Sequence, residues 1–590
     1  MAELSVPLDA FISTFGTQIE LSSDALGGKI IDVSDEFFAE AFHLIKVQPA
    51  PSLKGQFGPK GALFSGWETR RHNDSFDWCI IRLGATGFIS GFDIDTSHFN
   101  GNEAPEASVE ALYDNGESPP TCDDKRWKEI LPRVKLGPSS RHLFKSTDTS
   151  KDVVFNYVKL NMFPDGGIAR FRVYGLVNAI MTNPCEIIDL ANVFSGGRAV
   201  FVSDQHFGVG SNLLLPGRGK DMGDGWETKR SRVKGHKDWV IIKLGVPGVL
   251  EHAEIDTAHF MGNFPESCEL HAIHSDYVIP AAKEESEWSA VLPRTKLGPH
   301  RRHFFQLTDV QEKVFTHVRV TIHPDGGIKR VRIFGRPVVS SSNAPLEANG
   351  ALYSPNGVFT LNSPTEPSGN VSPPPASLAD QRPPIPALPL TPEAFAPFGR
   401  VIQSYASPYA APPKTKVTPA NQGSATKFHK LALLDSNYPE GSGATSGLST
   451  YRCLPLQYDP KEAVTMGWEV KLLERHRFTT QAFVPMGGGG NGEDSLKEPG
   501  DKYLVIVAHN IGDSDDKPDL TSLRAFVAHA GQTVMYNAAV WHHPMVALQR
   551  AMDFVCVETQ IGDGSTADCE IIDIEKDVEG GYPRVRIPLL

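Results

Sequence analysis

Hydrophobic and polar residues alternate along several short segments of the chain, which is the pattern of β-strands that bury one face. Residues 158–162 read Val-Lys-Leu-Asn-Met and residues 318–322 read Val-Arg-Val-Thr-Ile, so apolar side chains fall at every second position. Pro-Asp-Gly-Gly follows each segment, and we interpret it as the turn of an antiparallel hairpin. Many short strands with Gly and Pro between them and few helical runs predict a β-sandwich.

The first 337 residues contain two copies of one pattern. GWETRR at 66–71 returns as GWETKR at 225–230, IDTSHF at 94–99 as IDTAHF at 255–260, and PDGGI at 164–168 at 324–328. A period near 160 residues is too long for a solenoid unit, so each copy is predicted to be a domain, over 1–180 and 184–337. The first copy carries an insertion around residues 48–60, which we expect to be a surface loop.

The composition changes after the second copy. Residues 341–390 hold 11 of the chain's 45 prolines and few charges, so residues 338–386 are predicted to be a Pro/Ser-rich linker. Order resumes at Thr391-Pro392, which fits the start of a short helix running to Phe398. Strands are predicted over 503–508, 522–528, 534–537 and 553–560, and a closed β-barrel over 387–590 fits them best.

The overall charge excludes some partners. The chain has 57 basic and 70 acidic residues, a net charge of -13, which argues against nucleic acid and means that an anionic ligand needs local Arg, Lys or His. The start lacks a basic segment followed by an apolar run, and no apolar stretch approaches the roughly 20 residues of a membrane span. Seven scattered cysteines favour a reducing compartment, so we expect a cytoplasmic protein without membrane contact.

Each repeat carries polar residues that suit proton transfer or anion binding. They are Glu68, Asp95, His98, Arg133, Arg141 and Arg170, mirrored by Glu227, Asp256, His259, Arg294, Arg302 and Arg330. Arg170 and Arg172 share a strand face, where they could hold a carboxylate or lie on a solvated sheet surface. Asp95 with His98 suits a metal site or an oriented base, or a structural hydrogen bond between strands.

A second polar set lies in the C-terminal part. Its members are Glu474, Arg475, His476, Gln481, Lys517, His542 and His543. Side chains of these types projecting from separate strands into a barrel suit a small-carboxylate or metal pocket. A single histidine here could equally be a satisfied core residue, and Lys517 could be a solvated loop charge.

Longer strings in the sequence resemble two known families. The doubled GWETRR, IDTSHF and PDGGI set resembles allantoicase over residues 1–337. PLTPEAFAPFG, NQGSATKFH, ERHRFTTQAFVPM, DDKPDLTSLRAFV and VWHHP resemble ureidoglycolate lyase over residues 387–590. The resemblance implies an all-β chain: two tandem galactose-binding-like jelly-roll β-sandwiches, the linker and a cupin-like β-barrel.

The resemblance also implies two successive reactions of purine degradation. Allantoate and water would give ureidoglycolate and urea, and ureidoglycolate would then give glyoxylate and urea. For the first step we expect Arg side chains to hold the carboxylate while His98, His259 or a neighbouring Glu or Asp moves protons. For the second, a base near His476 or His543 would take the hydroxyl proton, and Arg475 or Lys517 would hold the acid.

Some alternatives stay open at this level. The chain could be an active allantoicase with a catalytically silent cupin tail, or a non-catalytic carbohydrate or small-acid binding protein. We expect a homo-oligomer that binds small-molecule substrates. The sequence does not decide whether the barrel binds a divalent metal, or which repeat carries the allantoate site. Residues 101–105 hold one residue more than residues 262–265, which puts equal activity of the two copies in question.

Overall fold

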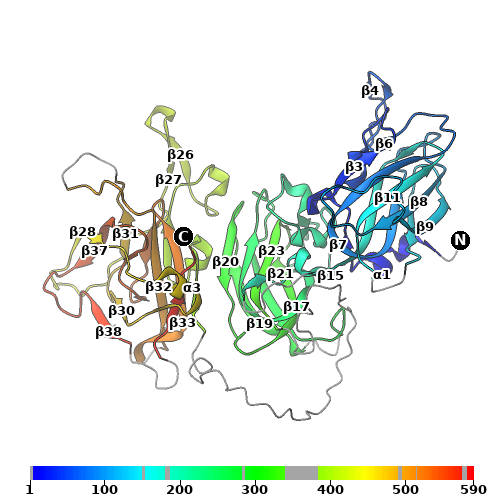
Figure 1. Ribbon diagram of the computed structural model, residues 1–590. Coiled ribbons are helices and arrows are strands. Elements are labelled where there is room, and N and C mark those ends of the chain that lie inside the picture. Colours follow the sequence, from blue (N-terminus) through cyan, green and yellow to red (C-terminus); the bar gives the residue numbers. More distant parts are fainter. Residues whose placement is uncertain are drawn as a thin grey trace, which may run out of the picture. The chain divides into compact units, whose positions relative to one another are not determined.

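The computed structural model describes residues 4–148, 153–179, 186–281, 286–338, 383–488, 494–512, 515–574 and 581–589 (Figure 1). Strands dominate all of these parts, which confirms the all-β prediction. Contacts divide the chain into two compact units, one made mostly of residues 1–361 and the other mostly of residues 362–590. Most of the predicted linker, residues 339–382, lies outside the described residues. No described helix is long and apolar enough to cross a membrane.

The first repeat is built around one long strand. Its elements are α1 (Phe11–Phe15), β1 (Ser5–Val6), β2 (Ile19–Glu20), β3 (Lys29–Val33), β4 (Phe57–Gly58), β5 (Gly61–Ala62), β6 (Trp67–Glu68), β7 (Asp77–Asp95), β8 (Glu106–Leu112), β9 (Lys128–Lys135), β10 (Arg141–Lys145), β11 (Phe155–Phe163), β12 (Gly167–Ile168) and β13 (Arg170–Val177). The first half of β7 pairs with β3 and β11, and its second half pairs with β10 and β13. One strand therefore serves both parts of the jelly roll.

The expected hairpin at Pro-Asp-Gly-Gly is wrong. Strands β11 and β13 do not pair with each other; each pairs with a different half of β7, in the registers Trp78↔Asn161 and Ile94↔Phe171. Between them, β12 pairs with β6, so that Gly167 lies opposite Glu68. The turn residues carry the chain across the sandwich because β7 is long enough, at 19 residues, to offer both strands a partner.

The second repeat has the same arrangement. Its strands are β14 (Ile188–Asp189), β15 (Arg198–Val202), β16 (Trp226–Glu227), β17 (Asp238–Asp256), β18 (Ser267–Ile273), β19 (Ser289–Lys296), β20 (Arg302–Gln306), β21 (Phe315–His323), β22 (Gly327–Ile328) and β23 (Arg330–Pro337). The long β17 takes the place of β7, and β16 pairs with β22 as β6 does with β12. Correspondence between the repeats therefore extends to strand order around the candidate site.

Alternating residues build the core of the first repeat as expected. Val158, Leu160 and Met162 of β11 are fully buried against Trp67, which is also fully buried, because every second side chain points between the layers. On the other face of β11, Lys159 lies over the ring of Trp127. The insertion at residues 48–60 is mostly exposed, as a surface loop should be.

The described C-terminal residues form two large sheets and the separate two-stranded β26–β27 hairpin. Its elements are β24 (Ile385–Pro389), α2 (Pro392–Phe395), β25 (Gly399–Ile402), β26 (Val417–Ala420), β27 (Ala425–Phe428), β28 (Thr445–Cys453), α3 (Pro460–Thr465), β29 (Trp468–Glu469), β30 (Leu472–Arg475), β31 (Gln481–Pro485), β32 (Lys502–Ile511), β33 (Asp515–His529), β34 (Thr533–Tyr536), β35 (Trp541–His542), β36 (Val546–Ala547), β37 (Met552–Gln560), β38 (Glu570–Asp573) and β39 (Arg584–Arg586). The sheet orders are β29-β39-β24-β33-β32-β35-β30-β38 and β25-β34-β31-β37-β28. This is a cupin-like domain, whose two sheets hold residues from the predicted strands, and Thr391 caps α2 as expected.

Candidate functional sites

In the first repeat, a buried carboxyl lies beside the end of the long strand. Glu68 of β6 is 7% exposed and accepts a hydrogen bond from Nδ2 of Asn102 (2.9 Å). Burial raises the pKa of Glu68 above its ordinary value, although the Asn102 hydrogen bond opposes the shift. Because a carboxyl with a raised pKa keeps its proton nearer to neutral pH, Glu68 suits the role of a proton donor.

Asp95 and His98 do not hydrogen-bond each other. Asp95 ends β7 and accepts from the backbone N–H of Ser97 (2.8 Å), whereas Nε2 of His98 faces the carbonyl oxygen of Ala50 (3.0 Å). His98 is exposed and has a positive φ of 71°. Neither a structural Asp-His bond nor an oriented base is therefore formed by this pair in the structure.

The second repeat keeps the glutamate pair and adds a guanidinium. Asn263 donates from Nδ2 to Glu227 (2.6 Å), as Asn102 does to Glu68. Arg218 donates from Nε and Nη2 to the two carboxylate oxygens of Asp256, at 2.7 and 2.9 Å. The side chain of Arg218 is 46% exposed while that of Asp256 is 1% exposed, so this cation is accessible to a solute. His259 repeats the positive φ of His98, at 68°.

Arg170 and Arg330 have become structural anchors. Arg170 is 1% exposed and donates to the carbonyl oxygens of Gln48, Ser65 and Ala169. Arg330 donates to the carbonyl oxygen and to the carboxylate of Asp224, the latter at 2.7 Å. Both guanidinium groups hold the loop before the Gly-Trp-Glu strand. They neither face solvent nor are free to bind a substrate carboxylate, because they are buried and hydrogen-bonded to the protein itself.

The other predicted arginines are each bound to a neighbour on their own sheet. Arg133 pairs with Glu106, and Arg141 donates to Asp93 (2.9 Å). In the second repeat, Arg294 donates to Oγ of Ser267 (2.7 Å) and Arg302 to Glu254 (2.7 Å). None of these bonds involves Glu68, Asp95, Glu227 or Asp256.

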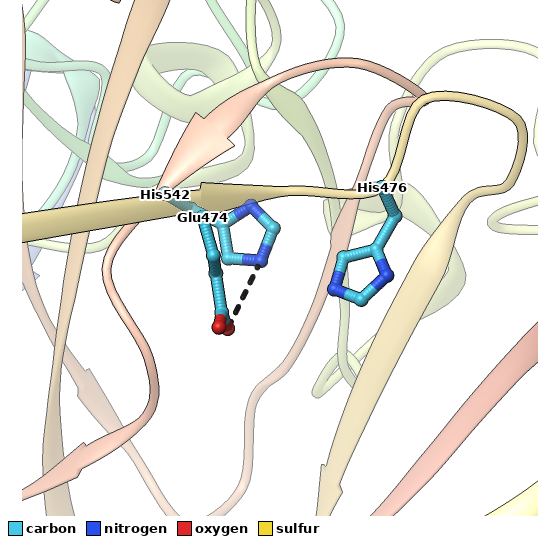
Figure 2. Close-up of side chains that lie close together, drawn as sticks. All are labelled: Glu474, His476 and His542. Carbon is cyan, nitrogen blue, oxygen red and sulfur yellow. Dashed lines mark ion pairs between the residues drawn. The ribbon is translucent and has the colours of Figure 1, made fainter. Parts of the chain in front are cut away.

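Three side chains converge in the C-terminal domain (Figure 2). Glu474 of β30 and His476 just after it are two residues apart and so lie on one side of the strand, and His542 of β35 lies opposite Glu474 in register. Nε2 of His542 is 3.7 Å from Oε1 of Glu474 and 3.1 Å from Oε1 of Gln481. The rings of His476 and His542 are stacked, 5.6 Å apart.

Glu558 on β37 completes this cluster. Its carboxylate accepts from Nε2 of Gln481 (3.1 Å) and lies 3.4 Å from Nδ1 of His476. Gln481 thus links His542 to Glu558, and this fixes the orientation of its amide. The sequence analysis missed Glu558, although an acid in the alternating apolar run of residues 552–558 was a signal for it.

Burial sets the protonation of the cluster. Burial and then the charge of Glu558 raise the pKa of Glu474 to about 7, so at neutral pH this carboxyl is divided between its two forms. Burial and then His476 lower the pKa of His542 to about 3, which keeps that imidazole neutral. A carboxyl that can both accept and return a proton at neutral pH is suited to general acid-base chemistry.

Glu474, His476, Gln481 and Glu558 of the cluster line a cavity of about 220 Å³, and His542 lies outside this lining. Its walls are formed by Tyr451, Cys453, Glu474, His476, Gln481, Phe483, Pro544, Met545, Glu558, Gln560, Asp568 and Cys569. None of these lining residues is Lys or Arg. Such a volume fits a small molecule of the size of a ureido acid.

Four predicted residues lie outside this lining: Arg475, Lys517, His542 and His543. Arg475 projects from the other face of β30 and donates to Glu570 (2.8 Å) and Asn510 (3.0 Å). The imidazole of His543 packs edge-on to Trp468 and faces the carbonyl oxygen of Pro544. Lys517 is exposed on β33. Strand parity separates Arg475 from Glu474 and His543 from His542, because adjacent residues point to opposite faces.

The same cluster could hold a metal ion. Ligand atoms of Glu474, His476 and His542 lie within 4.8 Å of one another. Both ring nitrogens of His476 are buried without a hydrogen-bond partner. Two imidazoles and a carboxylate are a donor set that suits divalent transition metals, so the residues present fit such an ion.

Comparisons with known proteins assign the two parts of the chain to families. A model described as allantoicase repeat matches residues 19–178 and 188–338, and a model described as ureidoglycolate lyase matches residues 382–579.

Individual relatives match the N-terminal part. A probable allantoicase of Schizosaccharomyces pombe is 47% identical over 333 residues, which are 56% of this chain and 95% of the relative. The allantoicase of Saccharomyces cerevisiae is 45% identical over 324 residues, 54% of this chain and 93% of the relative. A crystal structure of allantoicase from the latter organism superposes with a TM-score of 0.50 and 42% identity, covering 56% of this chain and 99% of that one.

Proposed function

Because the chain belongs to the allantoicase family and carries a ureidoglycolate lyase domain, it is a bifunctional purine-degradation enzyme, and we propose how its two parts act. The repeats hydrolyse allantoate to ureidoglycolate and urea. The C-terminal domain cleaves ureidoglycolate to glyoxylate and a second urea. This conclusion rests on the presence of both family matches on one chain. The bifunctional enzyme is therefore favoured over an allantoicase with a catalytically silent C-terminal domain and over a non-catalytic binding protein.

For the first step, we propose the second repeat as the site. The substrate is an anion, and Arg218 is an accessible guanidinium beside a buried carboxylate, whereas Asp95 has no ion pair among the described residues. Arg218 would hold the carboxylate of allantoate. Glu227, oriented by Asn263, would protonate the departing urea nitrogen while water adds to the central carbon, with His259 or Asp256 receiving the proton of the water.

For the second step, we propose Glu474 as the base. The carboxylate takes the hydroxyl proton of ureidoglycolate, the carbon-oxygen double bond forms, and the carbon-nitrogen bond to urea breaks. The leaving nitrogen then needs a proton, which Glu474 can return because its pKa of about 7 makes both forms accessible. Gln481, which lines the cavity and is hydrogen-bonded to neutral His542, is placed to hydrogen-bond the ureido group.

A divalent metal in the barrel stays a prediction. Glu474, His476 and His542 would hold it, and when bound it would supply a Lewis acid that polarises an oxygen of the substrate. Assay of the chain after dialysis against a chelator, and again after addition of manganese, nickel or zinc, measures whether cleavage of ureidoglycolate depends on it.

Counting products tests the whole proposal. Full-length enzyme given allantoate should release two ureas and one glyoxylate per molecule consumed. Given ureidoglycolate, it should release one urea and one glyoxylate. A chain that stops at one urea with no glyoxylate would leave only the hydrolase, and release of no urea with any metal would refute both activities.

We further propose that the enzyme is a cytoplasmic homo-oligomer with the predicted domains at 1–180, 184–337 and 387–590. The six described cysteines are free thiols, which suits a reducing compartment. Among the described residues, strand β28 ends its sheet and pairs only with β37, so one of its edges has no described partner and could pair with another chain. Sedimentation of the purified chain would test the oligomer, and fractionation of cells the location.

A further inference from the structure

The lyase pocket lacks a positive group for its substrate's carboxylate. Glu474, Glu558 and Asp568 line it, and no lining residue is Lys or Arg. Asp568 is a strong acceptor, since its carboxylate receives the hydroxyl of Tyr438 (2.7 Å) and the backbone N–H groups of Ile561 and Gly562 (2.7 Å each). A ureido acid entering this pocket adds a further negative charge, which a cation brought from outside the lining would compensate.

The β26–β27 hairpin carries such cations on one face. In its antiparallel register, Thr418 lies opposite Lys427, and the backbone N–H of His429 donates to the carbonyl oxygen of Lys416. Alternation therefore places Lys416, Thr418, Lys427 and His429 on the same face. The hydrogen-bond distance of 2.8 Å between Oγ1 of Thr418 and Nε2 of His429 agrees with this placement.

Nothing described in the chain neutralises this basic face. Lys416 and Lys427 are exposed and have no ion pair among the described residues. Residues 403–434 contain no Asp or Glu. The opposite face of the hairpin is anchored instead, because Phe428 packs against Tyr405, with ring centroids 5.5 Å apart. Figure 1 shows β26 and β27 projecting from the rest of the C-terminal domain.

The pocket lies next to an open sheet edge. Tyr451 and Cys453, which line it, belong to β28, the last strand of the five-stranded sheet. On and just beyond this strand, Leu448 is 73% and Leu454 74% exposed. Large exposed apolar side chains beside an unpaired strand edge are typical of a surface that another chain covers.

We propose that the β26–β27 hairpin of a second copy of this chain delivers Lys416 and Lys427 to the barrel pocket, where they hold the carboxylate of the ureido acid. Charge complementarity favours this occupant, since the hairpin carries lysines and no Asp or Glu, whereas three carboxyl groups and no Lys or Arg line the pocket. The assignment rests on the proposed lyase function. It makes each lyase site depend on two chains, with Glu474 from one and the lysines from the other.

Substitution of the two lysines tests the anchor. Full-length enzyme with Lys416→Met and Lys427→Met should lose at least tenfold in kcat/KM for ureidoglycolate. Lys430→Met is the matched control: it removes a lysine of the same segment that lies off this face, and it should stay within about twofold of the unmodified enzyme. Release of the first urea from allantoate reports that the repeats are folded, and an unchanged unfolding transition of the C-terminal domain reports that the substituted domain is folded. Unchanged kcat/KM in the double variant would overturn the proposal.

Co-expression decides which chain supplies the lysines. A chain with His476→Ala and a differently tagged chain with both lysine substitutions should each be inactive as a lyase. Purified through both tags, the mixed assembly should regain activity, to about half that of the unmodified enzyme if it is a dimer, because one of its two sites is intact. No recovery would show that the hairpin serves its own pocket and would overturn the proposal.

A binding measurement separates this inference from the lyase assignment. Calorimetry with glyoxylate, a small carboxylate, should show binding to the unmodified enzyme and at least tenfold weaker binding to the double lysine variant. If the unmodified enzyme binds glyoxylate through these lysines but cleaves no ureidoglycolate, the lyase function fails and the hairpin site stands. Equal binding of glyoxylate by the unmodified enzyme and the double lysine variant would refute the hairpin site and leave the lyase assignment unaffected.

Discussion

At the scale of single residues, the face of a strand decides what a side chain can do. Glu474, Arg475 and His476 are consecutive, yet the outer two line the cavity and Arg475 is 1% exposed on the other side, over the ring of Trp541. Sequence analysis grouped the three by their chemistry. The structure divides them, and Arg475 acts on stability through Glu570.

Glu570→Gln should destabilise the C-terminal domain in a pH-dependent way. Burial acts to raise the pKa of Glu570, but the hydrogen bonds from Arg477 and Arg475 outweigh it and hold the pKa below its ordinary value of 4.5. The ionised carboxylate therefore contributes stability above that ordinary pKa, and the contribution is lost as pH falls through the folded-state pKa. We expect a loss of about 1–3 kcal/mol at pH 7 in denaturant unfolding.

The same substitution gives its own control at low pH. Once the carboxylate is protonated in both folded and unfolded chains, Gln and Glu should give similar stability. A destabilisation that is equal at pH 7 and at pH values below the folded-state pKa would contradict the role assigned to this ion pair.

The two repeats offer a matched pair of glutamates. Glu227→Gln should lower kcat/KM for allantoate by about 100-fold or more, because general acid-base groups contribute roughly 10²–10⁴-fold. Glu68→Gln, the equivalent change in the first repeat, should stay within about threefold. Steady-state assay of urea release distinguishes them, and the reverse order would move the site to the first repeat.

At the scale of elements, alternation and turn residues predicted most strands but not their partners. Residues 158–162 and 318–322 are in strands whose apolar face is buried as expected, but the polar side chains of Lys159, Asn161 and Thr321 are buried as well, so the prediction of a single buried face is wrong. The Pro-Asp-Gly-Gly turn was assigned to a local hairpin because adjacent strands often pair. Here β7 pairs with both strands, and pairing between segments that are distant in the sequence cannot be inferred from a local window.

Gly166 in that turn requires a conformation that other residues avoid. Its φ is 145°, and a Cβ there would lie 2.7 Å from the Cα atom of Ala104. Gly166→Ala should therefore cost about 3 kcal/mol or more, from strain and overlap together. The control is Gly101→Ala, where φ is 88° and no atom lies within 4 Å, so strain of roughly 1–2 kcal/mol is expected. Equal effects in thermal unfolding would contradict this reading of the close approach.

At the scale of the whole molecule, the two activities should be separable on one chain. Glu474→Gln in full-length enzyme should release one urea per allantoate and accumulate ureidoglycolate, since the second site has lost its base. Glu227→Gln should release no urea from allantoate but should still form glyoxylate from added ureidoglycolate. Glyoxylate and urea assays on both variants check this. If either substitution abolished both reactions, two independent sites would be excluded.

The sequence alone determined the doubled N-terminal pattern, the all-β class and the residue types of the C-terminal polar set, because repeats, alternation and residue type are local properties. Only the tertiary structure shows which charged side chains bind other groups of the protein. The sequence predicts Arg170, Arg330 and Arg475 as substrate anchors, but in the structure each is hydrogen-bonded to neighbouring protein groups. The tertiary structure also added Glu558 and Asp568 to the pocket and left the lining without a Lys or Arg. The partners of these side chains and the lining of the pocket depend on which strands become neighbours in space, and this involves contacts between segments that are distant in the sequence.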